Sequence, residues 1–330
     1  MSKAKAPVHG AREDGTASGM VQSSREIWVA NVIRIIVITI AILFALFPIV
    51  FVTLSAFNPE GTISTFSLPD IEQPSDLFQN FNDLMFDENN LAINPFWQWL
   101  RNSFIVAITS TILSVLITAL SAYSFSRFRF WGRRQLLLGI LLIQVFPNLL
   151  AMVALYLILQ QIGTLPDEIP NIFPFLAGID WGWLNLFALN SLGGLILVYL
   201  GGAMGINTWL MKGFFDSVPR DIDESALVDG ATHWQIFWLL IFPLVRPILA
   251  VVGVLAFVGT FNEFVLASIL LSDDNETLMV GLFGFINDKF DRNWGMFSAG
   301  ALVSAVPVVI IYLALQDQIV GGLTAGSVKG

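Results

Sequence analysis

The segment ESALVDGATHWQIFWLLIFPLVRP, residues 224–247, places acidic and small residues ahead of a glycine in a chain that is otherwise largely apolar. Pro219 is suited to open a helix, and the acids of DIDE (221–224) would then occupy its first turn, where they complement the positive end of the helix dipole. Gly230 supplies the backbone freedom with which such a helix can stop and turn. The sequence therefore predicts a short helix with a surface of small residues, a bend, and an amphipathic segment that re-enters the membrane.

Apolar runs on both sides of this segment indicate a polytopic helical membrane protein. Hydrophobic residues make up 55% of the 330 residues and charged residues 12%, about half of the charged share of a soluble domain. A helix needs about 20 apolar residues to cross a bilayer, and tryptophans cluster near the boundaries of such runs here. The glycine-rich fourth run could instead be re-entrant. Six spans are predicted, at about 28–56, 97–123, 136–160, 192–211, 248–271 and 297–315.

Lysine and arginine are unevenly distributed between the predicted loops. The turn SRFRFWGRRQ (126–135) between the second and third spans holds four arginines, and the amino-terminal tail adds two arginines and two lysines. The connections 58–90 and 161–191 hold neither residue type. The positive-inside bias therefore predicts that both termini, the arginine turn and segment 224–247 face the cytoplasm.

Segment 224–247 resembles the EAA loop of ABC-importer permeases, whose signature is E-A-A-x-x-x-G followed after nine residues by I-x-L-P. The matching positions are Glu224, Ala226, Gly230 and Pro243. Three positions depart mildly, each keeping size or apolarity: Ser225, Leu240 and Phe242. The resemblance implies that seven residues take part in coupling to an ATPase: Glu224, Ser225, Ala226, Asp229, Gly230, Ala231 and Pro243. The pattern without the resemblance fits equally an interfacial helix whose acids face water.

In that family the loop is a coupling helix seated in a cleft of a cytoplasmic ATPase subunit, and closure of the ATPases drives alternating access. The implied partners are a homologous larger permease, an ATPase dimer and an extracytoplasmic sugar-binding protein. The sequence contains no G-x-x-x-x-G-K-[ST] phosphate loop and no cysteine. ATP and Mg are therefore expected on the partner ATPase, and this chain is expected to be no enzyme and to bind no cofactor or metal.

The resemblance extends from about residue 102 to residue 330, through AYSFSRFRFWGRR, LLIQVFPNLLAMVALYLIL, NTWLMKGFF and GLTAGSVKG. It is closest to the smaller, MalG-type permease of maltose/maltodextrin importers. It implies that the loop before the last span contacts the binding protein, through Asp273, Asp274, Asn287, Asp288 and Trp294. It implies that the carboxyl tail contacts the ATPases, through Thr324, Gly326 and Lys329. An ordinary solvated loop and a frayed tail are the alternatives.

Glu263 is the one acid well inside a predicted span. A carboxylate in that position is costly and should face the bundle interior or water, and Asn262 beside it offers donors and acceptors suited to sugar hydroxyls. A translocation pathway and a structural pair are equally compatible with these two residues. Proton coupling would usually need a relay of several intramembrane groups. Pro48, Pro147 and Pro307 are expected to kink their helices.

These observations predict an all-α membrane protein with six transmembrane helices and the type I ABC-importer permease fold, in the cell (inner) membrane. Residues 1–26 are expected to form a disordered cytoplasmic tail, 27–315 the permease domain, and 316–330 a cytoplasmic tail. Within the permease domain, 57–96 and 272–295 are expected to be extracytoplasmic loops and 212–240 the cytoplasmic coupling loop. The predicted function is import of maltose/maltodextrin-like oligosaccharides. Import of another sugar such as trehalose, or a self-sufficient secondary transporter, are the alternatives.

Overall fold

The computed structural model describes residues 24–59, 76–86, 95–145, 148–176, 178–203, 205–287 and 293–325. Within these ranges the regular structure is helical, without a strand. The chain divides into two compact units, residues 1–51 and 52–330.

Helix α1 (Ser24–Ala56) supplies the described part of the first unit and has Pro48 inside it, as predicted. Between residues 35 and 50 its side chains are apolar, apart from Thr39, and are exposed on every face. A helix that is apolar all round is a membrane span or a core element. This length and exposure therefore confirm α1 as a candidate span, over Trp28–Ala56.

The second unit contains the other helices, in the following chain order. They are η1 (Asp76–Phe78), α2 (Gln79–Met85), α3 (Pro95–Arg127), α4 (Arg133–Ile143), α5 (Asn148–Ile172), η2 (Pro174–Leu176), η3 (Gly182–Phe187), α6 (Leu192–Ala203), α7 (Ile206–Ser217), α8 (Arg220–Val228), α9 (His233–Gln235), the π-helix η4 (Ile236–Ile241), α10 (Phe242–Leu244), α11 (Arg246–Phe261), α12 (Val265–Leu270), η5 (Asp273–Asn275), α13 (Leu278–Asn287) and α14 (Trp294–Ala325).

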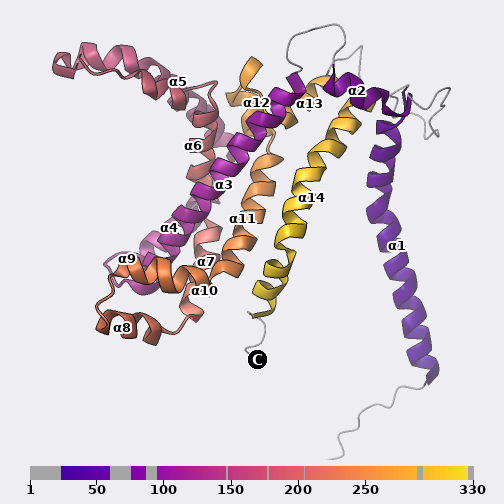
Figure 1. Cartoon of the computed structure of the whole chain (residues 1–330), viewed down its shortest axis with the longest axis horizontal. Helices are drawn as coiled ribbons and strands as arrows, with labels where there is room; N and C mark the ends of the chain where they lie inside the picture. Colours follow the sequence, from indigo (N-terminus) through magenta and orange to yellow (C-terminus); the bar gives the residue numbers. More distant parts are fainter. Residues whose placement is uncertain are drawn as a thin grey trace, which may run out of the picture. The chain divides into compact units, whose positions relative to one another are not determined.

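Helix α3 runs through the middle of this unit and packs against α6, α7, α11 and α13 (Figure 1). Its 33 residues correspond to about 50 Å of helix. The buried face of α3 is built largely from small side chains, among them Ala107, Ser110, Ser114, Ala119 and Ala122. Small residues let neighbouring helices approach closely inside a membrane, which explains how one helix contacts four others.

Among the described residues, four helices are long and apolar enough to span a membrane, and up to six spans result if two bent helix pairs each count as one. The bends are 53° between α6 and α7 and 79° between the segment His233–Leu244 and α11. The prediction of six spans agrees, by length and composition, with the count that treats each bent pair as one span.

The third predicted span, 136–160, differs from the structure. Helix α4 ends at Ile143, and the span candidate is Leu150–Ile172 within α5. A helix usually ends at or before the residue that precedes a proline, and Pro147 follows α4 in the sequence. At this end of α4 the Gln144 side chain accepts from the Ile206 amide of the α6–α7 break at 2.8 Å. Pro147 lies outside the described residues.

The fifth and sixth spans also differ from their predicted limits. Helix α11 ends at Phe261 and α12 begins at Val265, so the run 248–271 is interrupted near its end. Helix α14 contains Pro307, as predicted, and continues to Ala325, past the expected end of the permease domain at 315.

Helix α13 is locked between α3 and α14 by two buried glycines. A Cβ on Gly281 would lie about 2.1 Å from the Trp99 ring of α3, and a Cβ on Gly300 of α14 would lie 2.2 Å from Leu282 of α13. These approaches are closer than any side chain allows. Glycine is therefore required at both positions by the packing itself.

We expect Gly281→Val to destabilise the protein by about 1–3 kcal/mol, the usual cost of overpacking a close-packed site. Gly284→Val is the matched control, because Gly284 lies three residues further along α13 and has open space around it. The measurement is the thermal unfolding midpoint of the purified transporter. Equal midpoints for the two variants would contradict the packing argument.

Candidate functional site

Helix α8 is the short helix predicted from segment 224–247 and its upstream acids. Pro219 is its N-cap residue, and Asp221 and Asp223 lie in its first turn. At its other end the Ala231 amide donates to the Ala226 carbonyl at 2.9 Å and the Gly230 amide to the Leu227 carbonyl at 3.1 Å. This pair of bonds is a Schellman motif. Gly230 closes it with φ of +86°, a conformation that L-residues rarely adopt.

One face of α8 packs into the body of the second unit. Asp223 and Ala226 are its buried residues, and Ala226 joins a core cluster with Tyr123 of α3, Phe215 of α7 and Phe237 of η4. Ala226 therefore seats α8 on the rest of this chain, and its side chain is not available to a partner.

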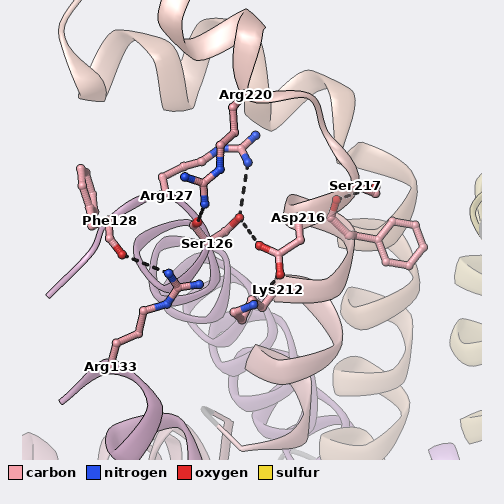
Figure 2. A network of polar contacts seen from close by, with 9 residues as sticks. Ser126, Arg127, Phe128, Arg133, Lys212, Asp216, Ser217 and Arg220 are labelled. Carbon is pink, nitrogen blue, oxygen red and sulfur yellow. Dashed lines mark hydrogen bonds and ion pairs between the residues drawn. The ribbon is translucent and has the colours of Figure 1, made fainter. Parts of the chain in front are cut away.

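A polar network ties α8 to the end of α3. Figure 2 shows the part of it around Ser126, Arg127 and Arg220. The Nε of Arg127 lies 2.8 Å from Oδ2 of Asp223, but it does not satisfy hydrogen-bond geometry there, so the contact is an ion pair. The Nη2 of Arg127 donates to the Val218 carbonyl at 3.1 Å. Arg220 donates in return to the Ser126 carbonyl at 2.9 Å. Two arginines thus join α8 and the residues before it to the last turn of α3.

The same network continues into α7. The Ser126 hydroxyl donates to Oδ1 of Asp216 at 2.6 Å, and Lys212, one turn earlier in α7, pairs with the other carboxylate oxygen of Asp216. Figure 2 shows Ser126 between the arginines and this carboxylate. The ends of α3 and α7 and the whole of α8 are therefore held together by side chains.

Burial sets the electrostatics of the Arg127–Asp223 pair. The two side chains are 6% and 12% exposed, and burial raises the pKa of the Asp223 carboxyl despite the opposing effect of Arg127, Arg220 and His233. The desolvation of Asp223 thus outweighs the attraction of its cationic neighbours. Buried ion pairs of this kind contribute little net stability, yet losing one partner is costly because a buried charge is left alone. We infer that the pair fixes the position of α8.

The other face of α8 is open. Glu224, Ser225 and Asp229 are exposed, as are Leu227 and Val228, of which Val228 is 88% exposed. Apolar side chains beside a serine and two acids, outside the apolar spans, make a surface suited to a partner with a complementary groove. The structure thus places Glu224, Ser225, Asp229 and Gly230 of the predicted coupling residues at this exposed end.

The chain beyond Gly230 turns back along the end of α3. Thr232 and Gln235 form a capping box that starts α9, and the Tyr123 hydroxyl of α3 donates to the His233 carbonyl at 3.5 Å. Ala231 is half-buried and Pro243 is exposed beside the 79° bend into α11. The predicted bend is therefore present, and a helical segment follows it that leads into α11.

The other end of α3 holds the turn around η5. Gln98 donates to the Asp274 carbonyl at 2.6 Å, and Asn102 donates to the carbonyls of Asp274 and Glu276, both at 3.0 Å. The side chains of Asp273 and Asp274 are exposed. Burial, and next the charge of Asp273, raise the pKa of Glu276. The turn thus has an anchored backbone and two outward carboxylates.

The remaining predicted contact residues are only partly described. Asn287 ends α13 and Trp294 begins α14, and the two helix ends meet where the Asn293 amide donates to the Phe285 carbonyl at 2.9 Å. Asp288, Gly326 and Lys329 lie outside the described residues, and of Thr324 only the helical backbone is described.

Glu263 lies at the break between α11 and α12 and is surrounded by donors. Its carboxylate accepts from the Tyr199 hydroxyl of α6 at 2.6 Å, from the Leu266 amide at 2.8 Å and from the Ala267 amide at 3.1 Å. Asn262 is exposed and donates to the Val258 carbonyl of its own helix at 3.0 Å. This geometry gives Glu263 hydrogen-bond partners within the chain, and the part of Glu263 and Asn262 in a translocation pathway stays a prediction.

Sequence reasoning missed Tyr199, Ser126 and Asp216, and used Arg127 and Asp223 only as charges. Ser126 and Asp216 are 90 positions apart, and Arg127 and Asp223 are 96 positions apart. Nothing in the local pattern around either partner points to the other. An acid within the apolar stretch 206–217 was the one available signal for the network.

The comparison with protein families identifies the chain. Residues 114–321 match the family described as binding-protein-dependent transport system inner membrane component. The chain belongs to this family. It is therefore a multi-pass membrane component of a binding-protein-dependent ABC transporter.

The chain is also similar in sequence to individual transport-system permeases. The chain is 37% identical over 286 residues to the galactooligosaccharides transport system permease protein GanQ of Bacillus subtilis, covering 86% of this chain and 90% of GanQ. It is 38% identical to the maltodextrin transport system permease protein MdxG of the same organism, over 74% of this chain and 78% of MdxG. It is 41% identical to the maltose/maltodextrin transport system permease protein MalG of Escherichia coli K12, over 72% and 73%.

Solved structures confirm the fold. A chain of a bacterial ABC transporter that imports the acidic polysaccharide alginate superposes with a TM-score of 0.69 at 22% identity, covering 90% of this chain and 98% of that one. A second structure, the alginate transporter in complex with an alginate-bound periplasmic protein, gives 0.59 at 15% identity. The predicted type I importer permease fold is thereby confirmed.

The ion pair can be tested by a double-mutant cycle on Arg127→Met and Asp223→Leu. We expect each single variant to lose about 3–5 kcal/mol, because each leaves a buried charge alone, and the double variant to lose much less. The measurement is the thermal stability of the purified complex. Glu224→Leu, on the exposed face, should change stability by less than about 0.5 kcal/mol. Additive losses in the double variant would show that the two charges do not interact.

Proposed function

We propose that this chain is the permease subunit of an ABC importer for maltose/maltodextrin-like oligosaccharides, and that it couples ATP hydrolysis by a partner ATPase to alternating access. The observation that carries the proposal is the arrangement along α3. One end of that helix is bonded to α8, and the other end is bonded to the acidic turn around η5. A coupling surface and a binding-protein surface would therefore lie at opposite ends of one rigid element, on opposite sides of the membrane.

The distribution of arginines supports the orientation of the chain in the membrane. The arginine turn 126–135 begins at the end of α3 to which α8 is bonded. The positive-inside bias assigns this end to the cytoplasm. Both termini are proposed to share that side, in the cell (inner) membrane.

The exposed face of α8 is proposed to be seated in a groove of the ATPase. Helix-in-groove contacts use a few anchor side chains from one helix face, and Leu227 and Val228 offer such anchors beside the small Ser225. ATP and Mg would be bound by the ATPase dimer alone. The movement of the ATPases would reach α3 and α7 through the buried polar network.

At the other end, the exposed carboxylates of Asp273 and Asp274 are proposed to contact an extracytoplasmic sugar-binding protein. A homologous larger permease would complete the translocation pathway. The relatives named for maltose, maltodextrin and galactooligosaccharides support an oligosaccharide as the substrate class. The choice among these sugars, or a disaccharide such as trehalose, is proposed to rest largely with the partner chains.

Gly230→Val tests the coupling role. A β-branched residue is strained at φ of +86°, by about 1–2 kcal/mol or more, so the end of α8 should move and its fit to the ATPase should be lost. We expect sugar uptake to fall at least tenfold while the protein stays in the membrane and the ATPases still hydrolyse ATP. Uptake and hydrolysis are measured together in proteoliposomes with the complete transporter.

Gly213→Val is the matched control, since Gly213 lies in α7 with open space around it and without positive φ. It should leave uptake and its ratio to hydrolysis near the wild-type values. If Gly230→Val takes up sugar at the wild-type rate, the coupling assignment is wrong.

The double variant Asp273→Asn, Asp274→Asn tests the opposite end. We expect the concentration of binding protein needed for half-maximal uptake to rise severalfold, because two outward charges are removed while the anchored backbone of the turn is kept. Asp167→Asn, Glu168→Gln removes two acids from α5, of which Asp167 is exposed and Glu168 is half-buried, and should have no such effect. A similar rise in both double variants would point to a general charge effect.

A further inference from the structure

A pocket of about 520 Å³ lies at the start of α4, beside the polar network. Three cationic side chains line it, Arg133 and Arg134 from α4 and Lys212 from α7, together with the apolar side chains of Phe130 and Leu137. None of the described residues that line it is acidic. The pocket is therefore shaped by cations on one part of its wall and by apolar groups on another.

Two of the three cations are held in place by the protein. Lys212 pairs with Asp216, and Nη1 of Arg133 donates to the Phe128 carbonyl at 3.5 Å (Figure 2). Arg134 is exposed and has neither a hydrogen bond nor an ion pair with any residue that the structure describes. Three positive charges thus line the pocket, and within the described ranges Asp216 is the one carboxylate that forms an ion pair with any of them. An anion bound in the pocket would neutralise part of this excess positive charge.

The backbone at this point adds to the positive potential. Gly132 is the residue before α4, with φ of +82°, and gives the helix no side-chain cap. The first amides of an 11-residue helix therefore begin beside the pocket. Uncapped amides at a helix start favour a negative group such as a phosphate.

The surface that continues from the pocket is apolar. Helix α4 has no buried residue, and Leu136, Leu138, Leu142 and Ile143 are exposed along it. Trp131, in the turn immediately before α4, is 98% exposed, and exposed tryptophan in a membrane protein is typical of the level of the lipid headgroups. A cationic pocket at the headgroup level that leads onto an apolar helix matches one kind of molecule, a phospholipid with a net negative charge.

We propose that this pocket binds the headgroup phosphate of an anionic phospholipid, with the acyl chains along the exposed side of α4. Arg134 is assigned as the residue that recognises the charge, and Arg133, Lys212 and the start of α4 complete the site. A free phosphate ion would use the cations but would gain nothing from the apolar face of α4. No residue of α8 lines the pocket, so the proposal stands whether or not the proposed function holds.

The test compares Arg134→Gln with Arg129→Gln in the complete transporter. Arg129 lies in the same turn and is exposed but does not line the pocket, so both variants lose one positive charge. Each is purified from membranes of phosphatidylglycerol and phosphatidylcholine, and retained lipids are counted by native mass spectrometry. Titration with phosphatidylglycerol then gives its apparent affinity.

We expect the wild type to retain phosphatidylglycerol in preference to phosphatidylcholine. Arg134→Gln should lower the apparent affinity for phosphatidylglycerol about fivefold, which is the effect of one cation near a lipid surface. Arg129→Gln should match the wild type within about twofold, and Arg134→Lys should keep most of the preference because it keeps the charge.

Three results would overturn the proposal. Equal losses in the Arg134 and Arg129 variants would mean a diffuse charge effect without a site. A wild type that retains both lipids equally would mean that the pocket does not select charge. If inorganic phosphate stabilises the wild type in phosphatidylcholine alone as much as phosphatidylglycerol does, the occupant is a free anion.

Discussion

Helix α3 has to satisfy polar contacts at both of its ends while its middle lies among apolar helices. At one end Arg127 leaves the helix to meet Asp223 of α8, and at the other end Gln98 and Asn102 hold the backbone of the η5 turn. The small side chains between these ends let α6, α7 and α11 pack closely. Because the helix is continuous, a displacement at either end cannot be absorbed along its length. The position of most other elements in the second unit therefore depends on α3.

The two faces of α8 differ in their surroundings. The inward face is fixed by Ala226 in the core and by the buried charge of Asp223. The outward face keeps exposed apolar residues that find no partner within the described part of this chain. A helix that was loose on its inward side would tilt in response to a bound protein and pass little movement on. The Arg127–Asp223 pair costs desolvation free energy and adds little net stability, and we infer that its contribution is the definite position of α8.

Local features of the fold could be predicted from the sequence, and long-range contacts could not. Pro219 and Gly230 set the limits of α8 through backbone properties that each residue carries by itself. The apolar runs predicted the spans, but not the contact between Gln144 at the end of α4 and the α6–α7 break, some 60 residues away. Glu263 was recognised as unusual, but Tyr199, which donates a hydrogen bond to it, looks like an ordinary aromatic residue of an apolar run.

The break at Glu263 separates two sets of neighbours. Helix α11 packs against α3, α7 and α14, whereas α12 packs against α5 and α6. The amides of Leu266 and Ala267 bond to the Glu263 carboxylate and not to the carbonyls of the preceding turn. A change in the angle between α11 and α12 would therefore break none of these bonds, provided that the carboxylate moves with α12. The run 248–271 can thus bend at this break, so that α11 and α12 follow different parts of the bundle during a transport cycle.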